Sequence, residues 1–294
     1  MSTLAVRVTG LHKHYGPKRA VDGLDLEVEQ GEIFAVLGPN GAGKTTTVEI
    51  LEGFRRRDAG EVSVLGEDPQ RAGRAWRSRI GVVLQDVDDH AELSVHELVH
   101  HFARYYPGAR DADEVIAAVG LTEKARTRTR QLSGGQRRRL DVALGIVGRP
   151  ELLFLDEPTT GFDPEARRSF WDLVAGLRDE GTTILLTTHY LDEAEHLADR
   201  CAVVRDGRVV AMDAPARLGG RASRHALVRW QTPEGPREEV TEAPTALVAR
   251  LAAALAPDGG EVPGLEVRRP TLEDVYLSLI GEQGADIDLE EVSR

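Results

Sequence analysis

The sequence is short of the residues that build disulfide scaffolds and membrane spans. It has 294 residues and one cysteine, Cys201, so no disulfide can form within the chain. A single cysteine fits a reducing compartment and excludes a cysteine-rich metal site. No apolar run reaches the roughly 20 residues that cross a bilayer, and the longest, 246–256, contains Arg250. The N-terminus lacks the apolar core of a secretory signal. We therefore expect a cytosolic chain without a leader or a membrane span.

An excess of positive charge is also missing. The chain carries 37 basic and 49 acidic side chains, for a net charge of −12. Domains that bind nucleic acid are usually basic, so we expect no nucleic-acid partner. Half of the net charge falls in the last quarter of the chain. Together with a length that fits roughly two domains, this indicates a domain boundary near residue 220.

Two kinds of strand pattern occur before that boundary. The runs 33–37, 152–155 and 183–187 are largely apolar and do not alternate, which is typical of parallel strands buried on both faces. Residues 4–9 and 24–29 alternate instead, which predicts half-exposed antiparallel strands. The sequence thus indicates an α/β fold with a covered parallel sheet and a separate antiparallel part.

Further elements are expected toward the C-terminus. Asp206-Gly207 accepts the positive φ angles of a type I′ turn, which predicts a hairpin. The elements expected there are strands at 201–204, 208–212, 225–230 and 265–268, an amphipathic helix at 244–256, and a helix capped by Thr271 that ends at Gly281.

A phosphate-binding loop follows the first buried strand. Residues 38–45 read Gly-Pro-Asn-Gly-Ala-Gly-Lys-Thr, which satisfies the pattern G-x-x-x-x-G-K-[ST] between a strand and a helix. Backbone amides and the helix N-terminus would surround phosphate. Lys44 would reach the β- and γ-phosphates, and the Thr45 hydroxyl would bind Mg²⁺. These residues predict an ATPase.

Polar residues end the other two buried strands. Asp156 ends the second strand, at the sheet edge where ligands bind in this architecture, so it can hold Mg²⁺. Glu157 follows with its side chain directed elsewhere and can accept the proton of an attacking water. His189 ends the third strand and can contact the γ-phosphate or that water, although a histidine there would, by itself, more often be an ordinary surface residue.

A second anion-binding sequence, Leu-Ser-Gly-Gly-Gln, stands at 132–136 and opens a helix. One chain rarely needs two sites for one γ-phosphate, so the second most simply serves the ATP of another molecule.

This order of motifs resembles the ATP-binding cassette (ABC) family over about residues 4–218. The resemblance implies a P-loop ABC cassette at 1–218, with a RecA-like parallel-sheet core, an antiparallel β subdomain and a helical subdomain at about 86–150. A small α+β accessory domain at 219–281 and an acidic flexible tail at 282–294 would follow.

The resemblance also implies roles for individual residues, with ATP and Mg²⁺ as cofactors. Catalysis would involve Glu157 as general base, His189 and Lys44. Metal binding would involve Thr45, Gln85 and Asp156. Tyr15 would stack on adenine, while Ser133, Gly134 and Gly135 would close on the γ-phosphate of a partner and Asp163 would lie across the interface. The expected nucleotide-binding residues are Tyr15, Gly38, Pro39, Asn40, Gly41, Ala42, Gly43, Lys44, Thr45, Thr46, Ser133, Gly134, Gly135, Gln136 and Asp163.

Features that the chain lacks indicate which class of ABC protein it resembles. One phosphate loop and no sustained heptad repeat favour a transporter subunit over the translation and chromosome-maintenance types. With no span, the chain needs a separate transmembrane permease, through which it would lie at the cytoplasmic face of the membrane. Two copies would complete both ATP sites. The alternatives are an importer subunit and a non-transport soluble ABC ATPase.

The ending indicates a direction of transport. Residues 270–281 resemble the closing helix of the daunorubicin-resistance type of export ATPase, with Tyr276 where phenylalanine is usual and Ile280 where threonine is usual. That likeness implies export of a drug or natural product.

Two other patterns have alternative interpretations. His96-Glu-Leu-Val-His100, followed by His101, matches the zinc-protease pattern H-E-x-x-H, but a catalytic zinc needs a third protein ligand and no candidate follows in the expected context. We expect a solvated helix start, and the sequence leaves open whether these histidines bind any metal. The arginines at 55–57, at 126, 128 and 130, and at 137–139 are expected on solvated helix faces or in intersubunit pairs.

Overall fold

The structure is a computed structural model, and it describes residues 3–83, 92–223, 226–257 and 259–281. The contacts divide the chain into two compact units, Met1–Met212 and Asp213–Arg294. Each unit is described by itself. The domain bounds at 218 and 281 stay predictions.

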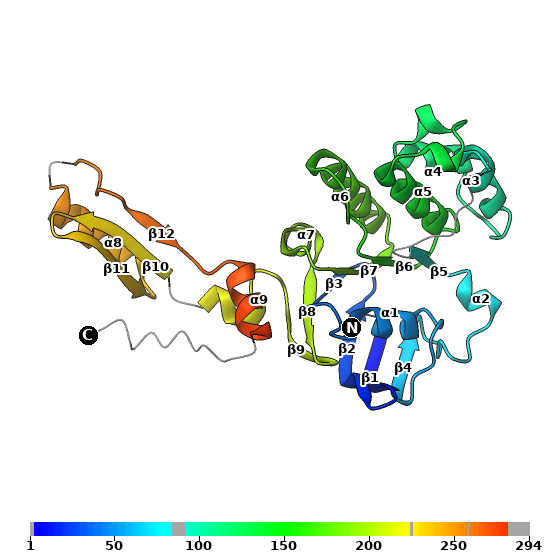
Figure 1. Ribbon diagram of the computed structural model, residues 1–294, viewed down its shortest axis with the longest axis horizontal. Coiled ribbons are helices and arrows are strands. Elements are labelled where there is room, and N and C mark those ends of the chain that lie inside the picture. Colours follow the sequence, from blue (N-terminus) through cyan, green and yellow to red (C-terminus); the bar gives the residue numbers. More distant parts are fainter. Residues whose placement is uncertain (1–2, 84–91, 224–225, 258, 282–294) are drawn as a thin grey trace. The chain divides into compact units, whose positions relative to one another are not determined.

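A six-stranded sheet, in the order β5-β6-β7-β3-β8-β9, forms the centre of the larger unit (Figure 1). Neighbours from β5 to β8 pair in parallel. Every residue of β3, β6 and β7 is buried, which confirms the prediction made from the three apolar runs. The strands are β3 (Ile33–Leu37), β5 (Ile80–Val83), β6 (Leu152–Asp156), β7 (Thr183–Thr188), β8 (Arg200–Arg205) and β9 (Arg208–Asp213).

The turn between β8 and β9 is the predicted type I′ hairpin turn. Asp206 has φ 50° and Gly207 has φ 75°, the positive angles that this turn requires. The Gly207 amide donates to the carbonyl of Ala42 at 2.9 Å, and the Gly207 carbonyl accepts from the Asp22 amide at 2.9 Å. The turn therefore bonds both to the loop after β3 and to a strand of the second sheet.

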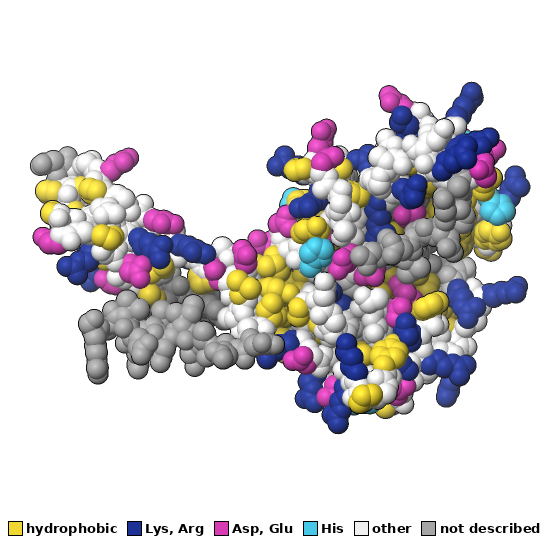
Figure 2. Space-filling model, viewed as in Figure 1, with side chains coloured by type: hydrophobic (Ala, Val, Ile, Leu, Met, Phe, Trp, Pro, Cys, Tyr) yellow, Lys and Arg dark blue, Asp and Glu magenta, His cyan; other side chains and the backbone are white. Residues whose placement is uncertain are grey.

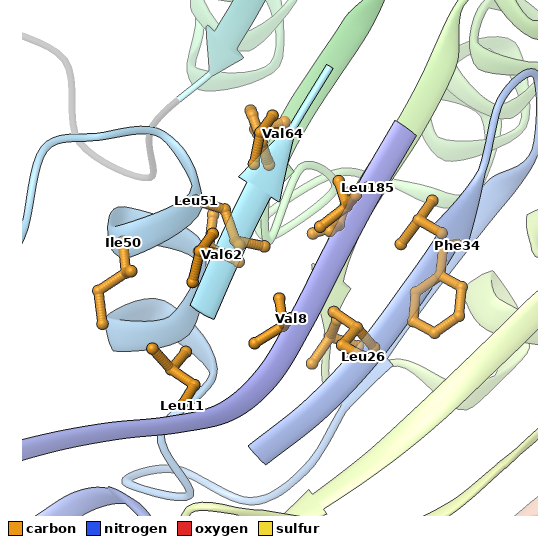
Figure 3. Packing of buried hydrophobic residues seen from close by; sticks show 14 of the residues in the cluster. Val8, Leu11, Leu26, Phe34, Ile50, Leu51, Val62, Val64 and Leu185 are labelled. Carbon is orange, nitrogen blue, oxygen red and sulfur yellow. The ribbon is translucent and has the colours of Figure 1, made fainter. Parts of the chain in front are cut away.

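That second sheet is antiparallel, in the order β2-β1-β4, as the alternating pattern predicts. Its buried face packs against α1 and the central sheet in one apolar cluster that includes Leu11, Leu26, Phe34, Leu51 and Leu185 (Figure 3). The elements are β1 (Leu4–Tyr15), β2 (Lys18–Glu29), β4 (Ala59–Val64) and α1 (Lys44–Leu51).

Three helices pack on one another in the segment predicted to be helical (Figure 1). They are α3 (Val95–Ala103), α4 (Ala112–Ala118) and α5 (Gly134–Ile146). A separate pair, α6 (Pro164–Asp179) and α7 (Leu191–Leu197), also packs together. The short elements of this unit are α2 (Arg74–Arg77), η1 (Thr122–Lys124) and η2 (Thr129–Gln131).

The C-terminal unit is α+β, as the sequence predicts. Its sheet has the order β11-β10-β12. Helix α9 begins at a capping box between Thr271 and Asp274, and on α8 Leu247 is buried while Leu255 remains 37% exposed. The elements are η3 (Leu218–Ser223), β10 (Ala226–Thr232), β11 (Gly235–Thr241), α8 (Pro244–Leu255), β12 (Glu266–Arg268) and α9 (Leu272–Ile280).

Charged side chains are mixed on the face that Figure 2 shows. Basic and acidic groups alternate over the described residues there instead of gathering into one basic area. Several of the arginines singled out in the sequence are paired within the chain: Arg55 with Glu49, Arg57 with Asp68, and Arg128 and Arg130 with Glu92.

Candidate nucleotide-binding site

The phosphate loop connects β3 to α1, and its backbone requires glycine at Gly38 and Gly43. Gly43 has φ 106°, and a side chain there would collide with the carbonyl oxygen of Ala20. A side chain at Gly38 would collide with the carbonyl oxygen of Val204. Pro39, Asn40 and Gly41 lie exposed at the crest of the loop, whereas Ala42 is buried beneath it. The loop therefore presents its backbone to the surface, as phosphate binding requires.

Lys44 lies inside this loop. Its side chain is 6% exposed, and its ammonium donates to the carbonyl oxygens of Gly38 at 2.7 Å and Pro39 at 3.2 Å. Burial lowers the pKa of the Lys44 ammonium, while the negative charges of Glu157 and Asp156 act in the opposite direction. The structure thus brings the predicted loop lysine and both predicted carboxylates into one electrostatic group.

The threonines that follow Lys44 differ in burial. Thr47 is buried and donates its hydroxyl to the Gly43 carbonyl at 2.9 Å, as part of the first turn of α1. Thr45 is exposed and Thr46 is half-buried. The exposed hydroxyl of Thr45, beside the loop, is the one expected to bind a metal.

Asp156 and Glu157 leave the end of β6 in different directions. Asp156 is 8% exposed, and its Oδ1 accepts a hydrogen bond from the Thr187 hydroxyl. Glu157 has φ 45°, a left-handed backbone conformation that is uncommon outside glycine and typical of functional sites. Its amide donates to the Thr187 carbonyl at 3.1 Å. The neighbouring strand β7 therefore holds the carboxyl group of Asp156 and the backbone of Glu157.

His189 lies beside Glu157. Its Nδ1 is 3.4 Å from Oε2 of Glu157, and the histidine side chain is 41% exposed whereas the glutamate is 16% exposed. The ring also stacks at a tilt on Tyr190, with centroids 4.1 Å apart. Two residues predicted separately, from the ends of two strands, thus meet at the edge of the sheet.

The Leu-Ser-Gly-Gly-Gln sequence caps a helix, as predicted. The Ser133 hydroxyl accepts from the Gln136 amide at 3.3 Å, and the Gln136 side chain accepts from the Ser133 amide at 3.1 Å, which closes a capping box at the start of α5. Ser133 and Gly134 are exposed, and Gly135 is half-buried. The exposed N-terminus of α5 is suited to an anion.

Two further predicted residues lie at element ends, and one lies outside the described part. Asp163 caps α6 by accepting from the Ala166 amide at 2.7 Å. Tyr15 ends β1, is 40% exposed, and has the Arg55 guanidinium 5.3 Å from its ring centroid. Gln85 falls outside the described residues.

Sequence reasoning was wrong about Arg138 and missed Thr187. We expected Arg138 on a solvated helix face or in an intersubunit pair, but it is 7% exposed and donates to the backbone carbonyls of Asp156 and Pro158 within the same chain. The signal was present: on α5 it lies one and two turns before the buried Val142 and Ile146, so helical periodicity places it on the core face. Thr187 could have been found as a polar residue that ends an apolar run predicted to be buried.

Comparison with known proteins identifies the family. Residues 21–160 match the family model described as "ABC transporter". The daunorubicin resistance ATP-binding protein DrrA3 of Streptomyces coeruleorubidus is 41% identical over 96% of this chain and 98% of its own length. The chain belongs to the ABC transporter family. The fluoroquinolones export ATP-binding protein of Mycobacterium tuberculosis is 37% identical over 96% of this chain and 95% of its own length.

Other ABC proteins agree with this assignment. The Nod factor export ATP-binding protein I of Burkholderia orbicola is 36% identical over 97% of this chain and all of its own. Among solved structures, cbiO1 of Clostridium perfringens, part of the ABC transporter complex cbiONQ, has a TM-score of 0.65 at 28% identity, covering 73% of this chain and 90% of that one.

Membership confirms the ABC cassette fold and the ATPase activity that the motifs predict, with ATP and ADP as the nucleotides of such cassettes. It also confirms the predicted likeness to the daunorubicin-resistance type. Within the described residues, no helix of this ABC protein has the length and apolar character needed to cross a membrane.

Proposed function

We propose that this chain hydrolyses ATP with Glu157 as the general base. The observation that carries the proposal is the contact of Glu157 with His189, at 3.4 Å, beside the buried Lys44. A carboxylate at this point can take the proton from a water attacking the γ-phosphate. His189 would orient that water or the γ-phosphate, and Lys44 would neutralise charge on the β- and γ-phosphates.

The proposed magnesium ligands are the Thr45 hydroxyl, the Asp156 carboxylate and the Gln85 side chain. This donor set fits the ion, because Mg²⁺ prefers oxygen ligands and takes only a few from protein. The hydrogen bond from Thr187 fixes the orientation of Asp156. When bound, Mg²⁺ would neutralise the charge that develops on the phosphates.

The remaining contacts with ATP would come from the phosphate loop, Tyr15 and Thr46. The exposed crest of the loop supplies amides for the phosphates, and the exposed ring of Tyr15 at the end of β1 would stack on the adenine. The residues proposed to contact the phosphates are Gly38, Pro39, Asn40, Gly41, Ala42, Gly43, Lys44, Thr45 and Thr46.

A second copy of the chain would complete each site. The support is the capped, exposed start of α5, where Ser133, Gly134, Gly135 and Gln136 form an anion-binding end. We propose that this end closes on the γ-phosphate held by the partner copy, with Asp163 at the interface.

The transport role rests on the relatives. Those described above are named for daunorubicin resistance and for export of Nod factor or fluoroquinolones. We propose that this chain powers export of a drug or natural product through a separate transmembrane permease, and that it reaches the cytoplasmic face of the membrane only through that permease. No nucleic-acid partner is proposed.

Replacement of Glu157 tests the base directly. Glu157→Gln keeps the size of the side chain but cannot accept a proton, so hydrolysis should fall by about 10²–10⁴-fold while ATP binding persists. Phosphate release measures ATP hydrolysis, and nucleotide titration measures ATP binding. Glu165→Gln, an exposed glutamate on α6, is the control and should retain the wild-type rate. Wild-type hydrolysis in Glu157→Gln would refute the assignment.

The transport role needs its own experiment. The chain should co-purify with a membrane protein that has about six apolar segments of roughly 20 residues. Cells producing both proteins should accumulate less drug than cells producing the Glu157→Gln variant with the same membrane protein. Equal accumulation with every drug and natural product tried, or purification of the chain without such a partner, would contradict the proposal.

A further inference from the structure

Two histidines and an aspartate meet on the helical region away from the nucleotide site. His96 and His100 lie one turn apart on α3, with ring centroids 4.0 Å apart. Asp113, in the first turn of α4, places Oδ1 at 3.5 Å from Nε2 of each histidine. Among the residues that the structure describes, this is the one group of three or more potential ligands whose donor atoms all lie within 4.8 Å of one another.

Two of the distances among these atoms match those between metal ligands. Bonds of about 2.1 Å at tetrahedral angles place the ligands of a zinc ion about 3.4 Å apart, close to both distances from Asp113. A nitrogen–oxygen distance of 3.5 Å is too long for a good hydrogen bond. The carboxylate therefore lies between the two rings without bonding closely to either.

Nε2 of His100, one of the three potential ligand atoms, has no hydrogen-bond partner among the described residues. This atom is covered from solvent, although the side chain as a whole is 40% exposed. A covered polar nitrogen without a partner is unfavourable. Coordination of a cation would satisfy its lone pair.

Neighbouring residues do not engage the Asp113 carboxylate in helix capping, whereas Ser94 engages the Glu97 carboxylate. The cap of α4 is Asp111, which accepts from the Asp113 and Glu114 amides, so the Asp113 carboxylate is not used as a cap. Glu97 would be the general base of a zinc protease, but its Oε2 accepts from the amide and hydroxyl of Ser94 at 2.9 and 2.8 Å. The pattern H-E-x-x-H here supplies ligands without the base that proteolysis requires.

We propose that His96, His100 and Asp113 bind one divalent transition-metal ion, with Zn²⁺ the best match. Two imidazoles and one carboxylate suit zinc, and the 68% exposure of the Asp113 side chain leaves a route for entry and a position for water. The ion would join α3 to α4, and both helices pack against α5. Its role would be to hold together the helices around the Leu-Ser-Gly-Gly-Gln segment.

The test is zinc titration of the full-length, untagged protein after treatment with a chelator. We expect binding of one equivalent of Zn²⁺ and a rise in melting temperature with zinc. His100→Ala should weaken binding by at least ~10-fold and abolish the rise, as should Asp113→Asn, which retains the size of the side chain. In wild type, Co²⁺ should give the visible absorption of a tetrahedral site.

The matched control is His101→Ala. His101 is the next residue on α3, but its Nε2 is bonded to the Tyr105 hydroxyl at 2.9 Å, so its removal should leave zinc binding unchanged. Circular dichroism and ATP binding confirm that each variant is folded. Absence of stoichiometric zinc binding in wild type, or equal losses in His101→Ala and His100→Ala, would overturn the proposal. Neither outcome depends on ATP hydrolysis.

Discussion

At the scale of single residues, Arg138 joins the Leu-Ser-Gly-Gly-Gln helix to the strand that carries the proposed catalytic carboxylates. Its guanidinium is buried on α5 and donates to the carbonyls of Asp156 and Pro158, on either side of Glu157. Glu157 has a left-handed backbone, a conformation that persists only when neighbouring groups hold it. Arg138 is therefore a positioning residue for this segment.

Arg138→Met should weaken both stability and activity. Loss of the guanidinium leaves two buried carbonyls without their donor, which costs about 1–3 kcal/mol of unfolding free energy, and it frees the segment that holds Glu157. Denaturant unfolding measures the loss of stability, and phosphate release measures the loss of ATPase activity. Arg137→Met, at an exposed position of the same helix, should change neither. Equal effects of the two variants would contradict a positioning role.

At the scale of elements, the structure contains two matching helix starts with different expected roles. Ser94 caps α3 and Ser133 caps α5, each through a capping box. Ser94→Ala and Ser133→Ala should each lower the unfolding free energy by about 1 kcal/mol. ATP hydrolysis should fall in Ser133→Ala alone, because only that helix start is proposed to meet phosphate. A parallel fall in both variants would indicate that the loss reflects capping.

The end of α1 should make stability depend on pH. Burial raises the pKa of Glu52 to about 8 from 4.5, with smaller effects of the same sign from Asp156 and Glu49. Because the folded-state pKa lies above the unfolded one, the neutral carboxyl stabilises the fold fully below pH 4.5. This contribution, on the order of 5 kcal/mol, is lost as the pH rises from about 4.5 to about 8.

Glu52→Gln removes the titrating group and should flatten this part of the profile. Thermal unfolding across pH 4.5–9 should show the variant more stable than wild type at the alkaline end and similar at the acidic end. Glu61→Gln, at an exposed position, makes the same chemical change and should follow wild type. An unchanged slope in Glu52→Gln would show that other groups cause the dependence.

A feature of the fold could be predicted where the residues that determine it are close together in the sequence. The strands β3, β6, β7, β8 and β9 of the central sheet, the hairpin turn at 206–207 and the helix start at Thr271 follow from residues that are neighbours in the chain, and these were predicted. The edge strand β5 was not predicted. The order β5-β6-β7-β3-β8-β9 was not, because it depends on packing between distant segments. The ABC motifs predicted the partners Lys44, Glu157 and His189. Arg138 and Thr187 carry no motif, because Arg138 bonds to the backbone of another element and Thr187 bonds to the Asp156 carboxylate and the Glu157 amide.

At the scale of the whole molecule, the proposed shared site predicts complementation between defective copies. Lys44→Ala damages the phosphate loop, and Ser133→Arg places charge and bulk at the capped end of α5. Each variant alone should be inactive. A mixture should recover part of the ATPase activity, because a mixed pair combines an intact loop from one copy with an intact helix start from the other. Continued inactivity at every mixing ratio would contradict the shared site.

The turn at 206–207 links two parts of the molecule that would meet opposite ends of a nucleotide. Gly207 bonds to Ala42 of the phosphate loop and to Asp22 of the antiparallel sheet, and that sheet carries Tyr15. The part proposed to contact the base and the part proposed to contact the phosphates are thus connected through the backbone of one residue. A nucleotide bound as we propose would therefore contact two parts of the chain that are hydrogen-bonded to the same glycine.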